Sequence, residues 1–346
     1  MSKQKMTSME RVLATLGHQE PDRVPVFLLL SLHGAKELGI SIQDYFSKAE
    51  HVVEGQMRLR EKYQNDCIDA FFHAPIEIEA WGGEVIFSDD GPPNSGTPFI
   101  RDIQEIKFLK VPKVSESEGL QRVCDAISRF KSRIGNEVPI VGVAMSPFSL
   151  PVMQMGFDKY LDLMYLHPEE FHLLMHLNEQ FCVEWSNAQL AAGATAICYF
   201  DPVSSPTIIP REKYLETGYL IAKSTISKIK GPTATHFASG RCLGILEDVA
   251  TTGTAIAGVS ALEDLAKLKE KAQGKITLLG NLNGIEMRTW TPEKAEQKVK
   301  EAIFKAGRGG GFILSDNHGE IPFQVEDEIL MAISDAARKW GEYPLT

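Results

Sequence analysis

Residues 196–201 read A-I-C-Y-F-D, a short and unbroken apolar run that stops at an acidic residue. A run that is apolar at every position is typical of a strand covered by helices on both faces. Before it, residues 159–192 carry apolar side chains spaced by three and four, which indicates helix. A second run of the same kind, T-A-T-H-F-A, follows at 233–238. This part of the chain therefore predicts strand–helix–strand units in a parallel sheet.

Eight such apolar runs recur along the 346 residues, with helical stretches between them. They cover 24–30, 67–73, 139–145, 196–200, 233–238, 254–259, 276–280 and 312–315. Two helices are expected to start at Pro168 and Pro292, because each proline is followed by glutamate, which the first turn favours. Eight units predict an α/β fold, a (β/α)8 TIM barrel forming a single domain over 1–346, with an N-terminal helical extension in 1–20. The rival doubly wound sheet lacks its G-x-G-x-x-G mark after the first strand.

The composition excludes several classes of protein. Hydrophobic residues make up 43% and charged residues 24%, and the net charge is −10, which argues against nucleic acid as a partner. No stretch of 18 apolar residues suggests a membrane span, and no secretory signal is visible. The five cysteines are scattered without a C-x-x-C pair, as expected in a reducing cytoplasm. We therefore expect a cytoplasmic protein.

Chemistry in a TIM barrel gathers at the carboxyl ends of the strands. Three histidines stand there: His73 after the second run, His236 in the fifth and His318 after the eighth. The carboxylates near these ends are Glu77, Asp201 and Asp316. Histidine and carboxylate together can bind a divalent metal or pass protons. The alternative interpretation is a buried polar network that closes the top of the barrel.

Other side chains at the same ends are candidates for substrate contacts. Ser146 ends the third run, and Asn281 and Asn283 follow the seventh. We expect these three, together with His73, to orient a substrate. Six apolar residues near the second and third runs could line a pocket, although such residues more often form core: Phe71, Phe72, Met145, Phe148, Met153 and Met155.

Six longer segments carry a family resemblance. They are M-E-R-V-L-A-T-L-G-H-Q-E-P-D-R-V-P-V (9–26), E-I-E-A-W-G (77–82), S-P-F-S-L (146–150), F-D-P-V-S-S-P-T-I-I-P (200–210), L-L-G-N-L-N (278–283) and N-H-G-E-I-P (317–322). In these segments the chain resembles the uroporphyrinogen decarboxylase superfamily, and more closely its corrinoid-dependent methyltransferase branch. The resemblance implies a TIM barrel, in agreement with the strand count.

Two departures from the decarboxylases bear on the activity. The decarboxylases carry two substrate-binding arginines after the first strand, whereas residues 28–36 read L-L-L-S-L-H-G-A-K. Their aspartate at the end of the second strand is replaced here by His73. The resemblance therefore implies that uroporphyrinogen, with its eight carboxylates, is not the substrate.

A third departure concerns the methyltransferases that act on coenzyme M, which hold zinc on H-x-C and a later cysteine. Here the first motif reads His236-Phe237-Ala238, and the later cysteine aligns with His318. Nitrogen and oxygen ligands make a harder site, which suits an oxygen substrate better than a thiol. The resemblance thus implies transfer of a methyl group from a methylated small molecule, foremost a methoxylated aromatic (O-demethylation), to cobalt(I) of a corrinoid, in anaerobic one-carbon metabolism.

These implications assign roles to particular residues. His236, His318 and Asp201 would be catalytic, and zinc would be held by His236, His318 and Glu77, unless a side chain donates the proton directly. The D-x-H-x-x-G signature of a cobalamin domain is absent, so the corrinoid would arrive on a separate partner protein. Two alternatives stay open: a methylcorrinoid:thiol methyltransferase, and a non-catalytic barrel that binds a small ligand.

Overall fold

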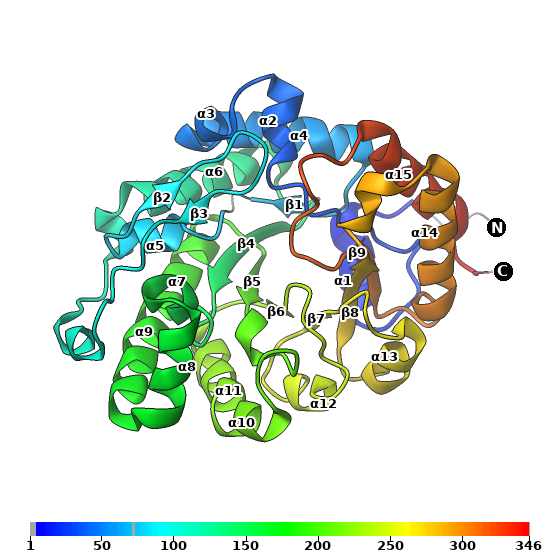
Figure 1. The fold of residues 1–346 in the computed structure, drawn as a ribbon. Helices are drawn as coiled ribbons and strands as arrows, with labels where there is room; N and C mark the ends of the chain where they lie inside the picture. The colour runs from blue at the N-terminus through cyan, green and yellow to red at the C-terminus, as the bar shows by residue number, and fades with distance from the viewer. Residues whose placement is uncertain (1–4, 71–72, 346) are drawn as a thin grey trace.

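The computed structural model describes residues 5–70 and 73–345. Its main sheet holds seven parallel strands in the order β1-β4-β5-β6-β7-β8-β9, curled around a central axis (Figure 1). The strands are β1 (Ile68–Asp69), β4 (Ile140–Met145), β5 (Ala196–Phe200), β6 (Thr233–His236), β7 (Ile256–Gly258), β8 (Thr277–Leu282) and β9 (Phe312–Asp316). Each lies in or overlaps one of the predicted apolar runs, with β8 and β9 extending past the ends of theirs, so the α/β fold and seven of the eight expected strands are confirmed.

The first predicted strand, 24–30, is extended chain without a regular ladder. It lies against β9 through one isolated parallel bridge between Val26 and Leu314. On its other side the amide of Val26 donates to the Asp66 carboxylate at 2.9 Å, and the amide of Leu28 donates to Oδ1 of Asn65 at 3.0 Å. The side chains of Asp66 and Asn65 thus accept the hydrogen bonds that the carbonyls of a neighbouring strand would accept in a ladder. This explains why segment 24–30 does not form an eighth regular strand.

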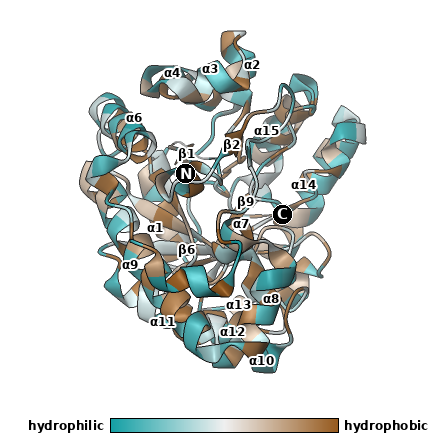
Figure 2. Cartoon of the chain, turned by 60° about the vertical axis from the view of Figure 1, so that its left-hand side comes forward, coloured by the Kyte–Doolittle hydropathy of each residue, from teal (hydrophilic) through white to brown (hydrophobic). Residues whose placement is uncertain are grey.

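An outer layer of helices covers the sheet. Its members are α2 (His33–Leu38), α3 (Ile42–Ser47), α4 (Ala49–Tyr63), α5 (Ile76–Ala80), α6 (Glu118–Ile134), α7 (Pro151–Met155), α8 (Phe157–Leu166), α9 (Pro168–Ala192), α10 (Arg211–Glu216), α11 (Gly218–Lys228), α12 (Leu246–Val249), α13 (Leu265–Ala272), α14 (Pro292–Ala306) and α15 (Asp327–Gly341). The helix starts predicted at Pro168 and Pro292 are confirmed. These helices carry both hydrophobic and hydrophilic residues (Figure 2), as expected for helices with one buried face. Among the described residues, no helix is long and apolar enough to cross a bilayer.

Helix α1 (Ser8–Leu16) packs against the N-terminal end of the sheet. Thr7 and Glu10 form a capping box at its start. Val12 on its inner face belongs to a small core cluster with Phe27 and Ile313. The helix lies within the predicted extension 1–20, of which residues 5–20 are described.

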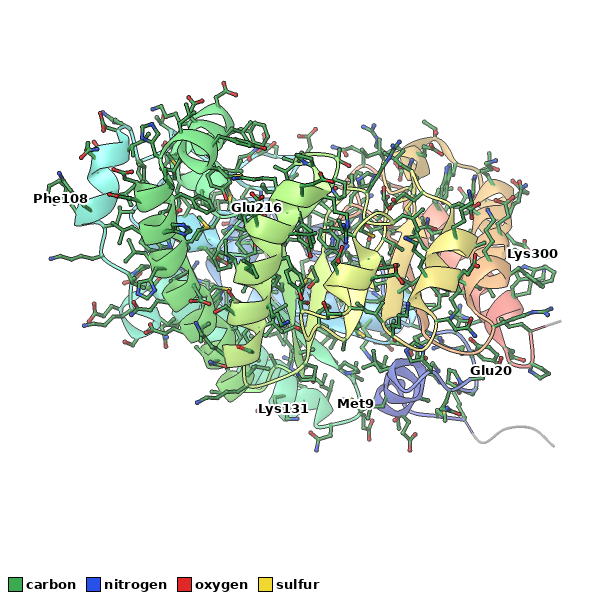
Figure 3. The ribbon with its side chains drawn as sticks, turned by 90° about the horizontal axis from the view of Figure 1, so that it is seen from below. Met9, Glu20, Phe108, Lys131, Glu216 and Lys300 are labelled. Carbon is green, nitrogen blue, oxygen red and sulfur yellow. The ribbon has the colours of Figure 1, made fainter. Side chains whose placement is uncertain are left out.

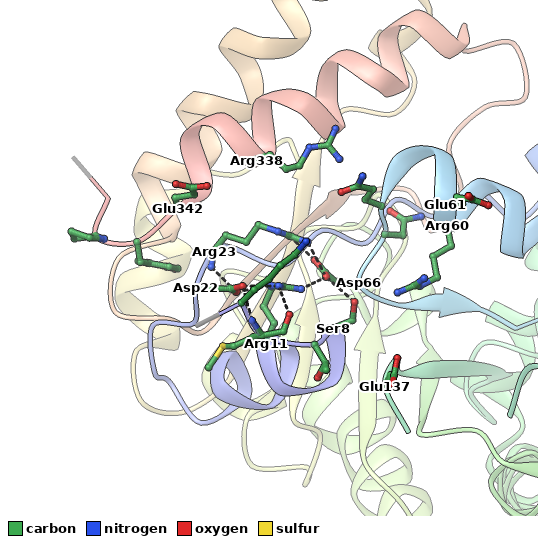
Figure 4. Close-up of a pocket in the computed structure, with 17 residues that line it drawn as sticks. Ser8, Arg11, Asp22, Arg23, Arg60, Glu61, Asp66, Glu137, Arg338 and Glu342 are labelled. Carbon is green, nitrogen blue, oxygen red and sulfur yellow. Dashed lines mark hydrogen bonds and ion pairs between the residues drawn. The ribbon is translucent and has the colours of Figure 1, made fainter. Parts of the chain in front are cut away.

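A buried ion network fastens α1 to the rest of the fold. Arg11, only 4% exposed, pairs with Asp22 at 2.7 Å and with Asp66 at 2.6 Å, and Arg23 pairs with Asp66 at 2.7 Å. These residues line a basal cavity of about 910 Å³ (Figure 4). The basal cavity adjoins α1, away from the strand ends where chemistry is expected.

Two outlying features did not follow from the sequence. A short antiparallel hairpin joins β2 (Val85–Ile86) to β3 (Asn94–Ser95) outside the main sheet. The 3-10 helix η1 (Ile103–Phe108) follows it and carries Phe108, which is 73% exposed and stands at the edge of the molecule (Figure 3).

Candidate active site

A cavity of about 110 Å³ lies inside the curled sheet, and we call it the central hollow. It extends from α1 at one end to Phe200, His236 and Gly319 at the carboxyl ends of the strands, which we call the mouth. Alternate strand residues point into it, as the two-residue period of a strand requires. Its apolar walls include Phe27, Leu29, Val141, Val143, Ile256, Leu279 and Ile313. Within the described chain no lysine or arginine lines it.

His236 ends β6 at the top of the hollow. Its ring is 2% exposed and stacks on Phe200, with 5.7 Å between ring centroids and 18° between planes. Nδ1 accepts a hydrogen bond of 3.0 Å from the amide of Ala238, and Nε2 is buried with no partner among the described residues. Burial, and then the nearby His318, lower the pKa of His236 to about 4. The ring is therefore neutral at pH 7, with its proton on Nε2.

His318 stands beside it at the mouth. Its Nδ1 is hydrogen-bonded to the hydroxyl of Ser239, and Nε2 lies 3.3 Å from Oδ1 of Asn283. Its amide donates to the Asp316 carboxylate at 2.9 Å. Partial burial lowers the pKa of His318 below its ordinary value. The structure thus brings His236 and His318 together, as their positions at strand ends suggested.

Asp69 is a side chain that the sequence interpretation missed. It is the second residue of β1, lines the central hollow and is 7% exposed. No group among residues 5–70 and 73–345 donates a hydrogen bond to its carboxyl. Burial alone raises the pKa of Asp69 to about 7. The available signal was an acid inside an otherwise apolar run, C-I-D-A at 67–70, which lies within the expected strand and not at its end.

Asp316, which is buried, and Glu320, which is partly buried, add two more carboxyl groups at the mouth. Glu320 accepts a hydrogen bond of 2.8 Å from the Ser31 hydroxyl. Burial chiefly, with Asp69 and Asp316 nearby, raises the pKa of Glu320 to about 7. Burial also raises the pKa of Asp316 to about 6. Neither Glu320 nor Ser31 was assigned a role from the sequence, although Ser31 follows the first apolar run and Glu320 lies in the segment N-H-G-E-I-P at 317–322.

The family described as Uroporphyrinogen decarboxylase (URO-D) matches residues 7–340. The chain belongs to this family of enzymes. Among its relatives, the uroporphyrinogen decarboxylase of Idiomarina loihiensis is 26% identical over 96% of both chains. That of Pseudoalteromonas translucida is 25% identical, over 90% of this chain and 92% of its own. The resemblance seen in the sequence is confirmed at the level of the family.

A solved structure shows the same fold. The methyltransferase from Methanosarcina mazei superposes with a TM-score of 0.84 and 21% sequence identity, over 97% of this chain and 99% of its own. At this identity the likeness concerns the fold alone. Membership of the corrinoid-dependent branch therefore stays a prediction.

In this family member, the predicted catalytic Asp201 is held by three serines. Its carboxylate accepts hydrogen bonds from the hydroxyls of Ser146 at 2.6 Å, Ser149 at 2.7 Å and Ser204 at 2.6 Å. All four side chains are buried. The geometry gives Asp201 and Ser146 a structural part, the tethering of the loops after β4 and β5, and leaves neither free for a substrate.

Glu77, predicted as a metal ligand, points elsewhere. Oε1 accepts a hydrogen bond of 2.8 Å from the amide of Met145. Burial raises the pKa of the Cys182 thiol on the outer helix α9, and the Glu77 carboxyl lies close enough to raise it further. Burial raises the pKa of Glu77 to about 8. Within the described residues, no three His, Cys, Asp or Glu side chains are placed to hold a metal ion. The expected ligand set of His236, His318 and Glu77 therefore does not fit zinc, because α5 carries Glu77 away from the hollow.

The remaining candidates lie around the mouth without lining the hollow. His73 is 3% exposed and packs edge-on against Phe46, with centroids 4.8 Å apart. Asn281 donates to the carbonyl of Ser260 at 3.0 Å, and with Asn283 it lines a separate cavity of about 160 Å³.

The apolar candidates are mainly core. Met145, Phe148 and Met155 are buried in the two large core clusters, and Met153 is partly buried against one of them. Phe71 and Phe72 lie outside the described residues.

Proposed function

We propose that this protein is a methyltransferase that moves a methyl group from a small methyl ether to cobalt(I) of a corrinoid carried by a separate protein. The foremost donor is a methoxylated aromatic. The observation that carries the proposal is the central hollow, an apolar cavity of about 110 Å³ whose lining includes the carboxyl of Asp69, the imidazole of His236 and the thiols of Cys67 and Cys198. An engineered cavity of about 150 Å³ holds one benzene molecule. The hollow is smaller than that cavity, so by volume it suits an alkyl group, or a small ring that enters it in part.

The same observation argues against a porphyrinogen as substrate. A molecule with eight carboxylates needs cationic partners, because buried charges must be paired. Among the described residues the hollow offers none, and Arg11 and Arg23 belong to the ion network beside α1. The relatives named uroporphyrinogen decarboxylase share the fold, and the site chemistry here favours an uncharged donor.

The site supports ether cleavage through a hydrogen bond to the leaving oxygen. With the organic group in the hollow, the ether oxygen would lie near Nε2 of His236, and the methyl group would face the mouth. The buried Nε2–H would donate to this oxygen and stabilise the charge that develops as the carbon–oxygen bond breaks. The apolar walls exclude water, so this hydrogen bond is strong.

The corrinoid enters this proposal as the methyl acceptor and rests on the family resemblance. His318, Ser239 and Asn283 form a polar rim at the mouth, where such a partner would approach. A resident zinc ion is not part of the proposal, because the described residues do not bring three ligands together.

The test is methyl transfer from anisole to chemically reduced cobalamin. We expect methylcobalamin and phenol to form in equal amounts, and no coproporphyrinogen to form when uroporphyrinogen is supplied instead. A variant that keeps the fold but lacks Nε2–H, His236→Asn, is the matched control. Absence of methyl transfer from any small methyl ether would contradict the proposal.

A further inference from the structure

We infer that Asp69 is the acid that gives its proton to the leaving oxygen of the methyl donor. This inference rests on the proposed function and deepens it, because it names the proton source. The evidence is the position of the carboxyl group in the central hollow, where it has no protein partner in the described chain and shares the cavity with the unpartnered Nε2 of His236.

The surroundings of Asp69 set its state. Burial in apolar walls disfavours the carboxylate, so much of the carboxyl is protonated near neutral pH, as its pKa of about 7 indicates. Glu320 is the neighbouring acid, and the thiol of Cys198 on β5 and the hydroxyl of Tyr45 on α3 also lie within its electrostatic reach. No cation is among these neighbours, so nothing holds Asp69 in its charged form.

The other acids near the site are less suited to this role. Glu320 and Asp316 do not line the hollow, and Glu320 already accepts the Ser31 hydroxyl. His236 is neutral, and loss of the Nε2 proton from a neutral imidazole is unfavourable near pH 7. Asp69 is the carboxyl in the described chain that faces an enclosed substrate directly.

In the proposed step the bond between the methyl carbon and oxygen breaks, and its electron pair stays on oxygen. The methyl carbon bonds to the cobalt(I) nucleophile of the acceptor, which becomes cobalt(III). The Asp69 proton moves to oxygen, leaving an alcohol or phenol and the Asp69 carboxylate, which water reprotonates after product release.

The first experiment compares the native protein with Asp69→Asn on two donors. With anisole we expect kcat to fall about 10²–10⁴-fold, the usual contribution of a general acid. With 4-nitroanisole, whose leaving phenolate needs little protonation, the loss should shrink to within about 10-fold, because acid assistance matters less for a good leaving group. The native rate should fall above pH 7, and that limb should vanish in Asp69→Asn.

Glu77→Gln is the matched control for this experiment. It also replaces a buried carboxyl with an amide, keeps the oxygen that accepts the Met145 amide, and lies outside the hollow. We expect its pH profile and its ratio of rates on the two donors to match those of the native protein. Equal losses on both donors in Asp69→Asn, or an unchanged pH profile, would overturn the assignment.

A second measurement does not need turnover. Binding of anisole without cobalamin can be followed by calorimetry from pH 5.5 to 9. If the protonated carboxyl donates to the ether oxygen, the Kd should rise about tenfold per pH unit above pH 7 in the native protein and stay flat in Asp69→Asn. Flat native binding, or no binding, would refute the role of Asp69. Normal pH-dependent binding without methyl transfer would instead refute the proposed function.

Discussion

The amide of Ala238 donates a 3.0 Å hydrogen bond to Nδ1 of His236, two residues earlier in the chain. Ala238 has a φ of 50°, in the left-handed region, and this turn of the backbone accompanies the approach of its amide to the ring. Because Nδ1 is the acceptor, the neutral ring carries its proton on Nε2, at the top of the central hollow. Ala238 stands at the position where the resemblance would place a cysteine in a thiol-activating relative. Here its amide instead sets the tautomer of His236.

Two substitutions separate the nitrogens of His236. In His236→Asn the amide oxygen can replace Nδ1 as acceptor, but nothing replaces Nε2–H. In His236→Gln the longer amide can present an N–H near the Nε2 position. We expect kcat/KM for anisole to fall about 10²-fold or more in the asparagine variant and much less in the glutamine variant. Equal losses would show that the Nε2 donor does not take part.

Glu77→Gln should change how stability depends on pH. Glu77 has a pKa of about 8 in the folded protein, against an ordinary value of 4.5. Between these values the unfolded chain releases a proton that the folded protein keeps, so this group's contribution is full below pH 4.5 and is lost as pH rises toward 8. The free energy of unfolding of the variant relative to the native protein should therefore rise by up to about 1.4 kcal/mol per pH unit in this range. Urea unfolding at several pH values measures this difference, and a difference independent of pH would show that Glu77 is ionised in the fold.

Asp66→Asn should destabilise the fold strongly. Asp66 is 1% exposed and neutralises both Arg11 and Arg23, so the substitution leaves a buried guanidinium without its full partner. Removing one partner of a buried pair typically costs about 3–5 kcal/mol. Glu116→Gln is the control, because its pair with Lys113 is exposed to solvent and should contribute little to stability. Comparable unfolding free energies for the two variants would contradict the structural importance of the network.

Removal of metal should not abolish activity. The described residues do not place three ligand side chains together, and Glu77 is bonded to the Met145 amide. We expect the rate of methyl transfer to survive dialysis against a strong chelator within about twofold, with the ionisable groups of the hollow supplying the acid chemistry instead. Loss of activity that zinc restores would show that the ligands rearrange, and would return His236 and His318 to the metal-binding role expected from the sequence.

Most of the fold was predictable because seven strands are continuous apolar runs, a local pattern that burial on both faces imposes. The extended segment 24–30 has the same pattern. Its lack of a ladder depends on the side chains of Asn65 and Asp66, which are distant in sequence and indistinguishable locally from ordinary polar residues.

The site was predictable only where side chains end strands. His236 and His318 meet because a curled parallel sheet brings the carboxyl ends of its strands to one mouth, although β7 and β8 lie between β6 and β9 in the sheet order. Glu77 comes eight residues after the end of β1 at Asp69, and the start of α5 at Ile76 turns its carboxyl toward the Met145 amide. Asp69 lies within a run whose composition says only that it is buried, and its inward direction depends on the curl of the sheet.

One preparation of the protein can be supplied with anisole and reduced cobalamin and, separately, with uroporphyrinogen. We expect stoichiometric methylcobalamin and phenol from the first mixture, with this product lost in His236→Asn, and no decarboxylated porphyrinogen from the second. Release of carbon dioxide from uroporphyrinogen, with no methyl transfer to cobalamin, would contradict the proposed function.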